Sequence, residues 1–272
     1  MIRELFHIGS YSQSPFGLLM VLAFVAAFLQ LRANFRRLGI GDEEDPNILI
    51  FWAAIGGFVG GKVYYSVLHQ DWRLLYERFG FVWYGGFLLA VTVVFLVVRR
   101  RHLPVVRTAD AAAPAMALGY AVGRVGCFLV GDDYGVPTSL PWGVRFPVGL
   151  PPTDAGSLRA QFGISIPADV PSDELLAVHP TQLYETIASL GVWALAMWAL
   201  RRFKRPGSVT LLVLALMAGE RFLVEFLRAK DDRLLGVFTV AQLISVLLLL
   251  VALALLAFRF RRTSSVEAAS GA

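Results

Sequence analysis

The sequence has little of what soluble proteins use to fold in water or to hold a cofactor. Only 17% of its 272 residues are charged, whereas 57% are hydrophobic, and the mean hydropathy is +0.63. Its single cysteine, Cys127, excludes an internal disulfide and a cysteine-rich metal site. The chain also has no HExxH motif, no P-loop and no GxGxxG in a strand-turn-helix setting. We therefore expect neither a metal nor a cofactor.

The positive charge of the chain does not indicate nucleic acid. The formal net charge is +5 and the pI is about 9.6, but the Lys and Arg residues form short clusters beside apolar runs. Such clusters are typical of the loops that flank membrane helices. We expect a membrane-embedded protein with no nucleic-acid partner.

Long apolar runs predict an all-α, polytopic membrane protein of about seven transmembrane helices. A helix that crosses the roughly 30 Å hydrocarbon core needs about 20 mostly apolar residues. The expected spans are residues 16–31, 48–68, 82–98, 111–130, 183–200, 209–227 and 235–258. The fourth and sixth are the weakest by hydropathy because each contains charged residues.

The distribution of Lys and Arg between the loops predicts an orientation. Fourteen of the 25 lie on one side, in clusters after the first, third, fifth and seventh spans, and eight lie on the other. Lys62, Arg124 and Arg221 remain inside spans. Because cytoplasmic loops are rich in Lys and Arg, we expect the N-terminus outside and the C-terminus in the cytoplasm.

The remaining segments predict one domain with two additions. A single transmembrane domain covers residues 1–262, with a small outer cap at 131–181 between the fourth and fifth spans. The cap has five prolines between positions 137 and 152, which predicts turns and short strands. Residues 263–272 are small and polar, and we expect a disordered tail.

Charged residues inside spans are the first candidates for chemistry. A charge at the centre of a membrane helix costs roughly 2.5–3.5 kcal/mol on insertion scales. Arg221, Glu225 and Arg228 follow at i, i+4 and i+7, which places them on one helical face. This face is either a salt-bridged packing surface or a cationic wall that binds a phosphate, with Glu225 holding Arg221.

A second candidate is Arg124, which stands among closely spaced glycines. These are Gly119, Gly123, Gly126 and Gly131. Glycines thin the helix surface and let another helix or a lipid headgroup approach Arg124. Helix packing through GxxxG, with Arg124 paired to Asp132 or Asp133, explains the segment equally well.

A third polar segment precedes the fifth span and reads His179-Pro180-Thr181-Gln182-Leu183-Tyr184-Glu185. A lone histidine is more often structural than catalytic. Tyr184 and Glu185, a turn further on, indicate that this segment lines a polar cavity instead of facing lipid.

Together the three segments resemble the bacterial prolipoprotein diacylglyceryl transferases. The family's long signature is similar to Gly123-Arg124-Val125-Gly126-x-Phe128-x-x-Gly131-acid-x-x-Gly135, followed by Thr138 and Trp142-Gly143-Val144. The second motif resembles residues 179–185 and the third resembles residues 221–228, in the family's order. The resemblance covers most of the chain, including residues 56–62 and Gly85-Gly86.

This resemblance implies an enzyme of the bacterial inner membrane. It would transfer the diacylglyceryl group of phosphatidylglycerol to the lipobox cysteine in the signal peptide of a prolipoprotein, forming a thioether and releasing glycerol phosphate. Fixed guanidinium groups in a low-dielectric pocket would stabilise the leaving phosphate.

The resemblance also implies roles for single residues. Arg124 and Arg221 would bind the phosphate and stabilise the leaving group, and Glu225 would orient Arg221. Arg228 belongs to the same substrate-binding set. Asp132 matches a glutamate that helps to hold the headgroup, and Gly135 allows close approach at the pocket mouth. His179, Gln182 and Glu185 would support the cavity.

Four positions depart from the family pattern. Tyr84 stands where a histidine usually precedes Gly-Gly, and it is the remaining catalytic candidate. Phe16 replaces a common tyrosine, Cys127 an asparagine, and Asp132 a glutamate. A divergent paralogue with another lipid or acceptor, or a non-catalytic protein that binds an anionic phospholipid, is therefore the alternative interpretation.

Overall fold

The computed structural model describes the backbone of residues 6–8, 11–77, 80–230, 233–234 and 238–270, and the side chains of 14–77, 80–230 and 238–258. Arg3 and Arg78, which enter the orientation count, lie outside the described residues, as does 271–272 of the expected tail.

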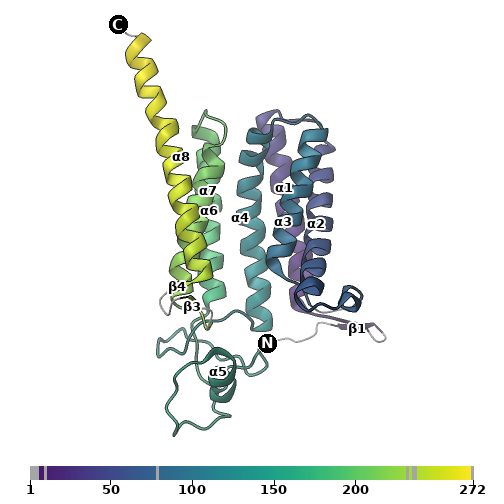
Figure 1. The fold of residues 1–272 in the computed structure, drawn as a ribbon, viewed down its shortest axis with the longest axis vertical. Helices are drawn as coiled ribbons and strands as arrows, with labels where there is room; N and C mark the ends of the chain where they lie inside the picture. Colours follow the sequence, from purple (N-terminus) through teal and green to yellow (C-terminus); the bar gives the residue numbers. More distant parts are fainter. Residues whose placement is uncertain (1–5, 9–10, 78–79, 231–232, 235–237, 271–272) are drawn as a thin grey trace.

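Seven long helices lie side by side, one over each predicted apolar run (Figure 1). They are α1 (Pro15–Leu38), α2 (Asp45–Leu68), α3 (Trp83–Arg100), α4 (Val105–Val130), α6 (Thr181–Arg202), α7 (Ser208–Glu225) and α8 (Val240–Ser270). Among the described residues, six helices are long and apolar enough to cross a membrane. The exception is α7, whose 18 residues include three charged ones. The prediction of an all-α polytopic membrane protein is confirmed.

The shorter elements connect these helices. Two antiparallel hairpins pair β1 (Phe6–Ile8) with β2 (Tyr11–Gln13) and β3 (Arg233–Leu234) with β4 (Phe238–Thr239). A 3-10 helix, η1 (Trp72–Leu75), follows α2, and α5 (Ala155–Phe162) lies in the cap. Elsewhere in the described part of the cap, extended segments pair through isolated bridges.

The end of the chain differs from the expectation of a disordered tail. The backbone of α8 continues as a helix to Ser270, and only 271–272 of the expected tail lie beyond it. Hydropathy alone does not detect this continuation, because residues 263–270 are small and polar. They contain no helix breaker such as proline, however, and can therefore continue the helix.

Local sequence signals set the ends of the helices that carry the site. At the start of α1, the Ser14 hydroxyl accepts a hydrogen bond from the Gly17 amide at 3.2 Å, and Pro15 occupies the first turn. At the end of α4, Gly131 adopts a left-handed conformation with φ of 71° and caps the helix. The chain then turns into the cap directly after Arg124 and Cys127.

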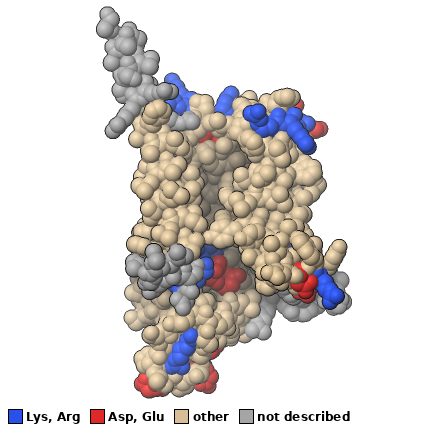
Figure 2. All heavy atoms as spheres, viewed as in Figure 1, with Lys and Arg blue, Asp and Glu red and all other residues tan. Residues whose placement is uncertain are grey.

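Two groups of helices are joined through α4. α2 packs on α3 and α1 packs on α4, while α6 and α7 pack on the other side of α4 and α8 packs on α7. Buried alanines of α4, including Ala111, Ala113 and Ala117, belong to the hydrophobic clusters on both sides. Small residues permit this close approach of helices. In Figure 2 a hollow separates the two groups on the face shown.

The long helices form an apolar band between two charged ends. Figure 2 shows Lys and Arg at the upper end, a wide band without charged side chains, and acidic and basic atoms together at the lower end of the hollow. The cap and the start of α1 lie at the lower end, and the end of α8 lies at the opposite one (Figure 1).

Two glycines of α2 differ in how closely they approach α3. A Cβ placed on Gly60 would lie 2.7 Å from Cβ of Leu89 and 2.9 Å from the carbonyl carbon of Gly85. A Cβ on Gly57, one turn earlier, would meet no atom within 4 Å. Only one of these two positions therefore requires glycine for helix contact.

We expect Gly60→Ala to destabilise the protein by about 1–3 kcal/mol, because the methyl group separates α2 from α3. The matched change Gly57→Ala should be neutral or stabilising by up to about 1 kcal/mol through helix propensity. Thermal unfolding of both variants in detergent measures this difference. Equal melting temperatures would show that the close contact does not matter.

Candidate functional site

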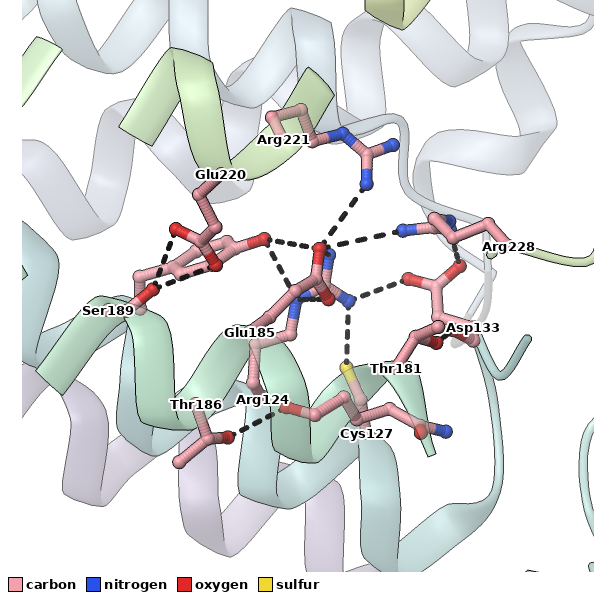
Figure 3. A network of polar contacts seen from close by, with 12 residues as sticks. Arg124, Cys127, Asp133, Thr181, Glu185, Thr186, Ser189, Glu220, Arg221 and Arg228 are labelled. Carbon is pink, nitrogen blue, oxygen red and sulfur yellow. Dashed lines mark hydrogen bonds and ion pairs between the residues drawn. The ribbon is translucent and has the colours of Figure 1, made fainter. Parts of the chain in front are cut away.

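The three polar segments of the sequence meet at one point, at the cap end of the helices (Figure 3). Glu185 of α6 lies between two arginines from other helices. Its Oε2 is 2.8 Å from Nε of Arg124, which comes from α4, and its Oε1 is 3.3 Å from Nη1 of Arg221, which comes from α7. The structure thus brings Arg124 and Arg221 to one shared carboxylate.

A second carboxylate, Asp133, joins a third arginine to this group. Oδ2 of Asp133 is 2.9 Å from Nη1 of Arg124, and Oδ1 accepts a hydrogen bond from Nη2 of Arg228. Nη1 of Arg228 is also 4.0 Å from Oε1 of Glu185. We call Arg124, Arg221 and Arg228 the arginine cluster.

Glu225 forms ion pairs with two members of the arginine cluster, Arg221 and Arg228. Its Oε2 is 2.8 Å from Nη2 of Arg221 and 3.7 Å from Nε of Arg228. The three side chains therefore meet as the spacing of the sequence predicts, but not on one helical face. α7 ends at Glu225, and Arg228 lies in extended backbone that bridges to Gly135.

Burial makes these ion pairs strong constraints on the side chains. The side chains of Glu185 and Glu225 are 1% and 0% exposed, and that of Arg228 is 5% exposed. An unpaired charge in such surroundings is strongly destabilising. Arg124 is 11% and Arg221 is 26% exposed, so their guanidinium groups lie at the accessible edge of the cluster.

A hydroxyl group extends the cluster into α4. The Tyr120 hydroxyl accepts a hydrogen bond from Nε of Arg124 at 2.9 Å and donates one to Oε1 of Glu185 at 3.2 Å. Further along α6 and α7, the Ser189 hydroxyl donates to both carboxylate oxygens of Glu220 at 3.1 and 3.2 Å. Sequence reasoning missed all three residues.

A signal for these residues does exist in the sequence. Tyr120 precedes Arg124 by four residues and Ser189 follows Glu185 by four, so each pair shares a helical face. Polar residues at helical spacing inside an apolar run indicate an interior surface.

The segment before α6 holds the loop that carries Asp132 and Asp133. The Thr181 hydroxyl donates to the carbonyl of Asp133 at 2.8 Å, and Nε2 of Gln182 donates to the carbonyl of Asp132 at 2.6 Å. Nδ1 of His179 lies 3.3 Å from the Tyr184 hydroxyl. Burial lowers the pKa of His179. None of these contacts reaches the arginine cluster, which is compatible with the supporting role expected for His179 and Gln182.

Gly135 lies where two backbone segments approach each other. Its amide donates to the carbonyl of His179 at 2.8 Å, and the next amide, Val136, donates to Leu227 at 2.8 Å. A Cβ at Gly135 would contact the Leu227 carbonyl and lie 2.7 Å from Cβ of His179. Glycine is needed here because it lets the cap pack against the segment that carries Arg228.

Asp132, expected at the lipid headgroup, contacts a different group. No ion pair joins its carboxylate to an arginine among the described residues; instead, Cys127, Asp132 and Asp133 have ligand atoms within 4.8 Å of one another. Burial, followed by the charge of Asp133, raises the pKa of Asp132 to about 6. For Asp133, the guanidinium groups of Arg228 and Arg124 hold the pKa of the carboxyl below its ordinary value.

Tyr84 is separate from this cluster. It stands in the first turn of α3, is 47% exposed, and its ring packs edge-on against Trp83 at 5.3 Å between centroids. No contact of the described residues connects Tyr84 with the three arginines. Cys127 does touch the cluster, since its Sγ is 3.8 Å from Nη1 of Arg124.

Comparison with known proteins gives a consistent result. A family model described as prolipoprotein diacylglyceryl transferase matches residues 3–258. A phosphatidylglycerol–prolipoprotein diacylglyceryl transferase of Geobacter sulfurreducens is 30% identical, over 94% of this chain and 95% of its own. Transferases of the same name from Clostridium tetani (28%, over 92% and 94%) and Thermotoga maritima (30%, over 91% and 81%) are also similar.

The raised pKa of Asp132 predicts a pH-dependent loss of stability. A carboxyl group whose pKa rises on folding stabilises the fold while it is protonated, and this contribution disappears as the pH rises from about 4 through about 6. We expect Asp132→Asn to melt higher than the parent at pH 7 and similarly at pH 4, with about 2–4 °C for each kcal/mol.

Asp169→Asn is the matched control, because Asp169 is an exposed acid of the same cap. It should give the same difference from the parent at both pH values. If Asp132→Asn behaves like this control, burial does not raise the pKa of Asp132.

Proposed function

The chain belongs to the prolipoprotein diacylglyceryl transferase family, and we propose that its arginine cluster binds the phosphate of phosphatidylglycerol while the diacylglyceryl group passes to a cysteine thiol of a prolipoprotein. The observation that carries this proposal is the meeting of Arg124 and Arg221, from two different helices, on one carboxylate within a bundle of apolar helices. A lipid with an anionic headgroup and apolar chains matches both features.

The reaction needs positive charge at this place. The thiolate attacks the terminal glyceryl carbon of the diacylglyceryl group, a C–S bond forms, and the C–O bond to the phosphate breaks. Glycerol phosphate leaves with the electron pair of that bond, so negative charge grows on its oxygen. Guanidinium groups that are already oriented stabilise this charge without reorganisation.

The contacts of each arginine suggest separate tasks. Arg124 and Arg221 are the more exposed members of the cluster and would contact the phosphate directly. Glu185 and Glu225 fix the planes of their guanidinium forks, and fixed forks recognise phosphate oxygens bidentately. Arg228 is nearly buried and would contact the phosphate only through the edge of its guanidinium group that pairs with Asp133.

The other expected site residues keep more modest proposals. Asp132 would face the glycerol hydroxyls of the headgroup, with Gly135 keeping the cap close at the pocket mouth. Tyr84 would act as a hydrogen-bond donor, since a phenol is a poor general base at neutral pH. This role requires the substrate to extend towards α3.

We place the protein in the bacterial inner membrane, with the N-terminus and cap outside. Fourteen Lys and Arg flank the opposite end, which the positive-inside rule assigns to the cytoplasm. The arginine cluster would then open to the outer leaflet, where the signal peptide presents its lipobox cysteine.

Transfer should depend on both arginines. With purified protein, phosphatidylglycerol and a lipobox peptide, we expect Arg124→Ala and Arg221→Ala to lower kcat about 10²–10³-fold, as loss of an oriented donor does. Mass spectrometry of the thioether peptide measures this. Arg37→Ala removes an exposed arginine at the other end of α1 and should leave turnover unchanged. Normal turnover in either site variant would contradict the proposed mechanism.

The residues that differ from the family pattern, among them Tyr84 and Asp132, lead to a second prediction. We expect the unmodified chain to restore growth of a bacterium depleted of its own diacylglyceryl transferase, because the arginine cluster is complete. Colony counts and lipidation of a reporter prolipoprotein measure the rescue. Rescue by Tyr84→His alone would instead mark a relative with different specificity, and Arg124→Ala serves as the inactive control.

A further inference from the structure

Asp133 differs from the other acids of the arginine cluster in its exposure. Its side chain is 42% exposed, whereas those of Glu185 and Glu225 are almost completely buried. It also comes from the loop after α4, not from the interior of a helix. Among the described carboxylates that pair with the arginine cluster, Asp133 is therefore the one that can leave it for water without a change in helix packing.

The position of Asp133 is that of a bound anion. One carboxylate oxygen contacts Nη1 of Arg124 and the other contacts Nη2 of Arg228, so the group bridges guanidinium forks from two segments. A phosphate bound between the same forks would make the same kind of contact. Carboxylate and phosphate cannot occupy this place together.

The charges of the cluster lead to the same conclusion. Three guanidinium groups face the buried carboxylates of Glu185 and Glu225, which leaves one positive charge. Asp133 supplies the balancing negative charge in the absence of lipid. A phosphodiester also carries a single negative charge, so it can replace Asp133 without leaving a buried arginine unpaired.

The backbone at Asp133 determines which substitutions this position accepts. Its φ is +56°, a left-handed conformation that is uncommon outside glycine and that Asp and Asn tolerate best. Gly131, two residues earlier, has a positive φ as well. Asn at position 133 is therefore compatible with the same loop, which makes it a fair test substitution.

We propose that Asp133 is an internal counter-ion that occupies the phosphate site while the enzyme is free of lipid and is displaced by the phosphate of the substrate. This inference rests on the proposed function of the arginine cluster. Asp133 thus acts as a specificity-determining residue. It keeps the arginines oriented when no substrate is bound, and only an anion that can displace its carboxylate from them can bind.

The test compares Asp133→Asn with Asp133→Glu, which keeps the charge, and with Asp169→Asn, which removes a charge from an exposed position of the cap. For each protein, transfer is measured against the mole fraction of phosphatidylglycerol in mixed micelles, and the Kd of the lipid is measured directly by calorimetry. Diacylglycerol, which has no phosphate, is the reference ligand.

An internal anion that occupies the site lowers the apparent affinity for the lipid, because only the fraction of protein with an open site can bind it. We expect Asp133→Asn to lower both the apparent KM and the Kd for phosphatidylglycerol about five- to tenfold, with no change for diacylglycerol. The apparent KM and the Kd of Asp133→Glu and Asp169→Asn should remain within about twofold of the parent values. A purely structural role would lower kcat and stability but would not tighten lipid binding.

Unchanged or weaker lipid binding by Asp133→Asn overturns the inference, whatever happens to kcat. The two proposals fail in distinguishable ways. If the parent protein binds phosphatidylglycerol but transfers nothing, the proposed function fails, and the Kd values still decide the role of Asp133. If the parent transfers normally and the Kd does not fall in Asp133→Asn, only the inference about Asp133 fails.

Discussion

The carboxylate of Glu185, buried among helices that cross an apolar band, fixes the arrangement of the whole site. It stands 2.8 Å from Arg124 and 3.3 Å from Arg221, and the Tyr120 hydroxyl also donates to it. Each charge inside a membrane helix costs roughly 2.5–3.5 kcal/mol on insertion scales. Pairing offsets part of that cost only where both partners are held, so α4, α6 and α7 must come together at this point. The constraint that assembles the fold is therefore also the one that orients the guanidinium groups.

The rest of the architecture keeps this group both dry and reachable. Buried alanines let α4 pack between the two groups of helices, and acidic and basic atoms lie together at the lower end of the hollow in Figure 2. The cap is fixed to the end of α7 through Gly135 and Arg228, so the loop with Asp133 reaches the arginines from the water side. A lipid can lay its acyl chains along the apolar helices while its phosphate reaches the arginine cluster at the cap end.

Much of this architecture could be predicted from the sequence, for identifiable physical reasons. Apolar runs of sufficient length have few folds open to them in lipid, so the seven long helices follow from hydropathy. The i, i+4 spacing predicts the contact between Arg221 and Glu225. By contrast, the sequence leaves Asp132 and Asp133 as equal candidates for pairing with Arg124, because the turn after Gly131 decides which adjacent acid faces the cluster. The central place of Glu185 depends on how three helices pack, which no local pattern specifies.

The central claim is that guanidinium groups from α4 and α7 form one phosphate site. The location of the lipid phosphorus in an experimental structure of this protein, determined in bilayer discs of phosphatidylglycerol, tests that claim most directly. We expect a phosphate within hydrogen-bond distance of both Arg124 and Arg221, with the Asp133 carboxylate turned away. A phosphate held by only one of these arginines, or at another surface, would contradict it.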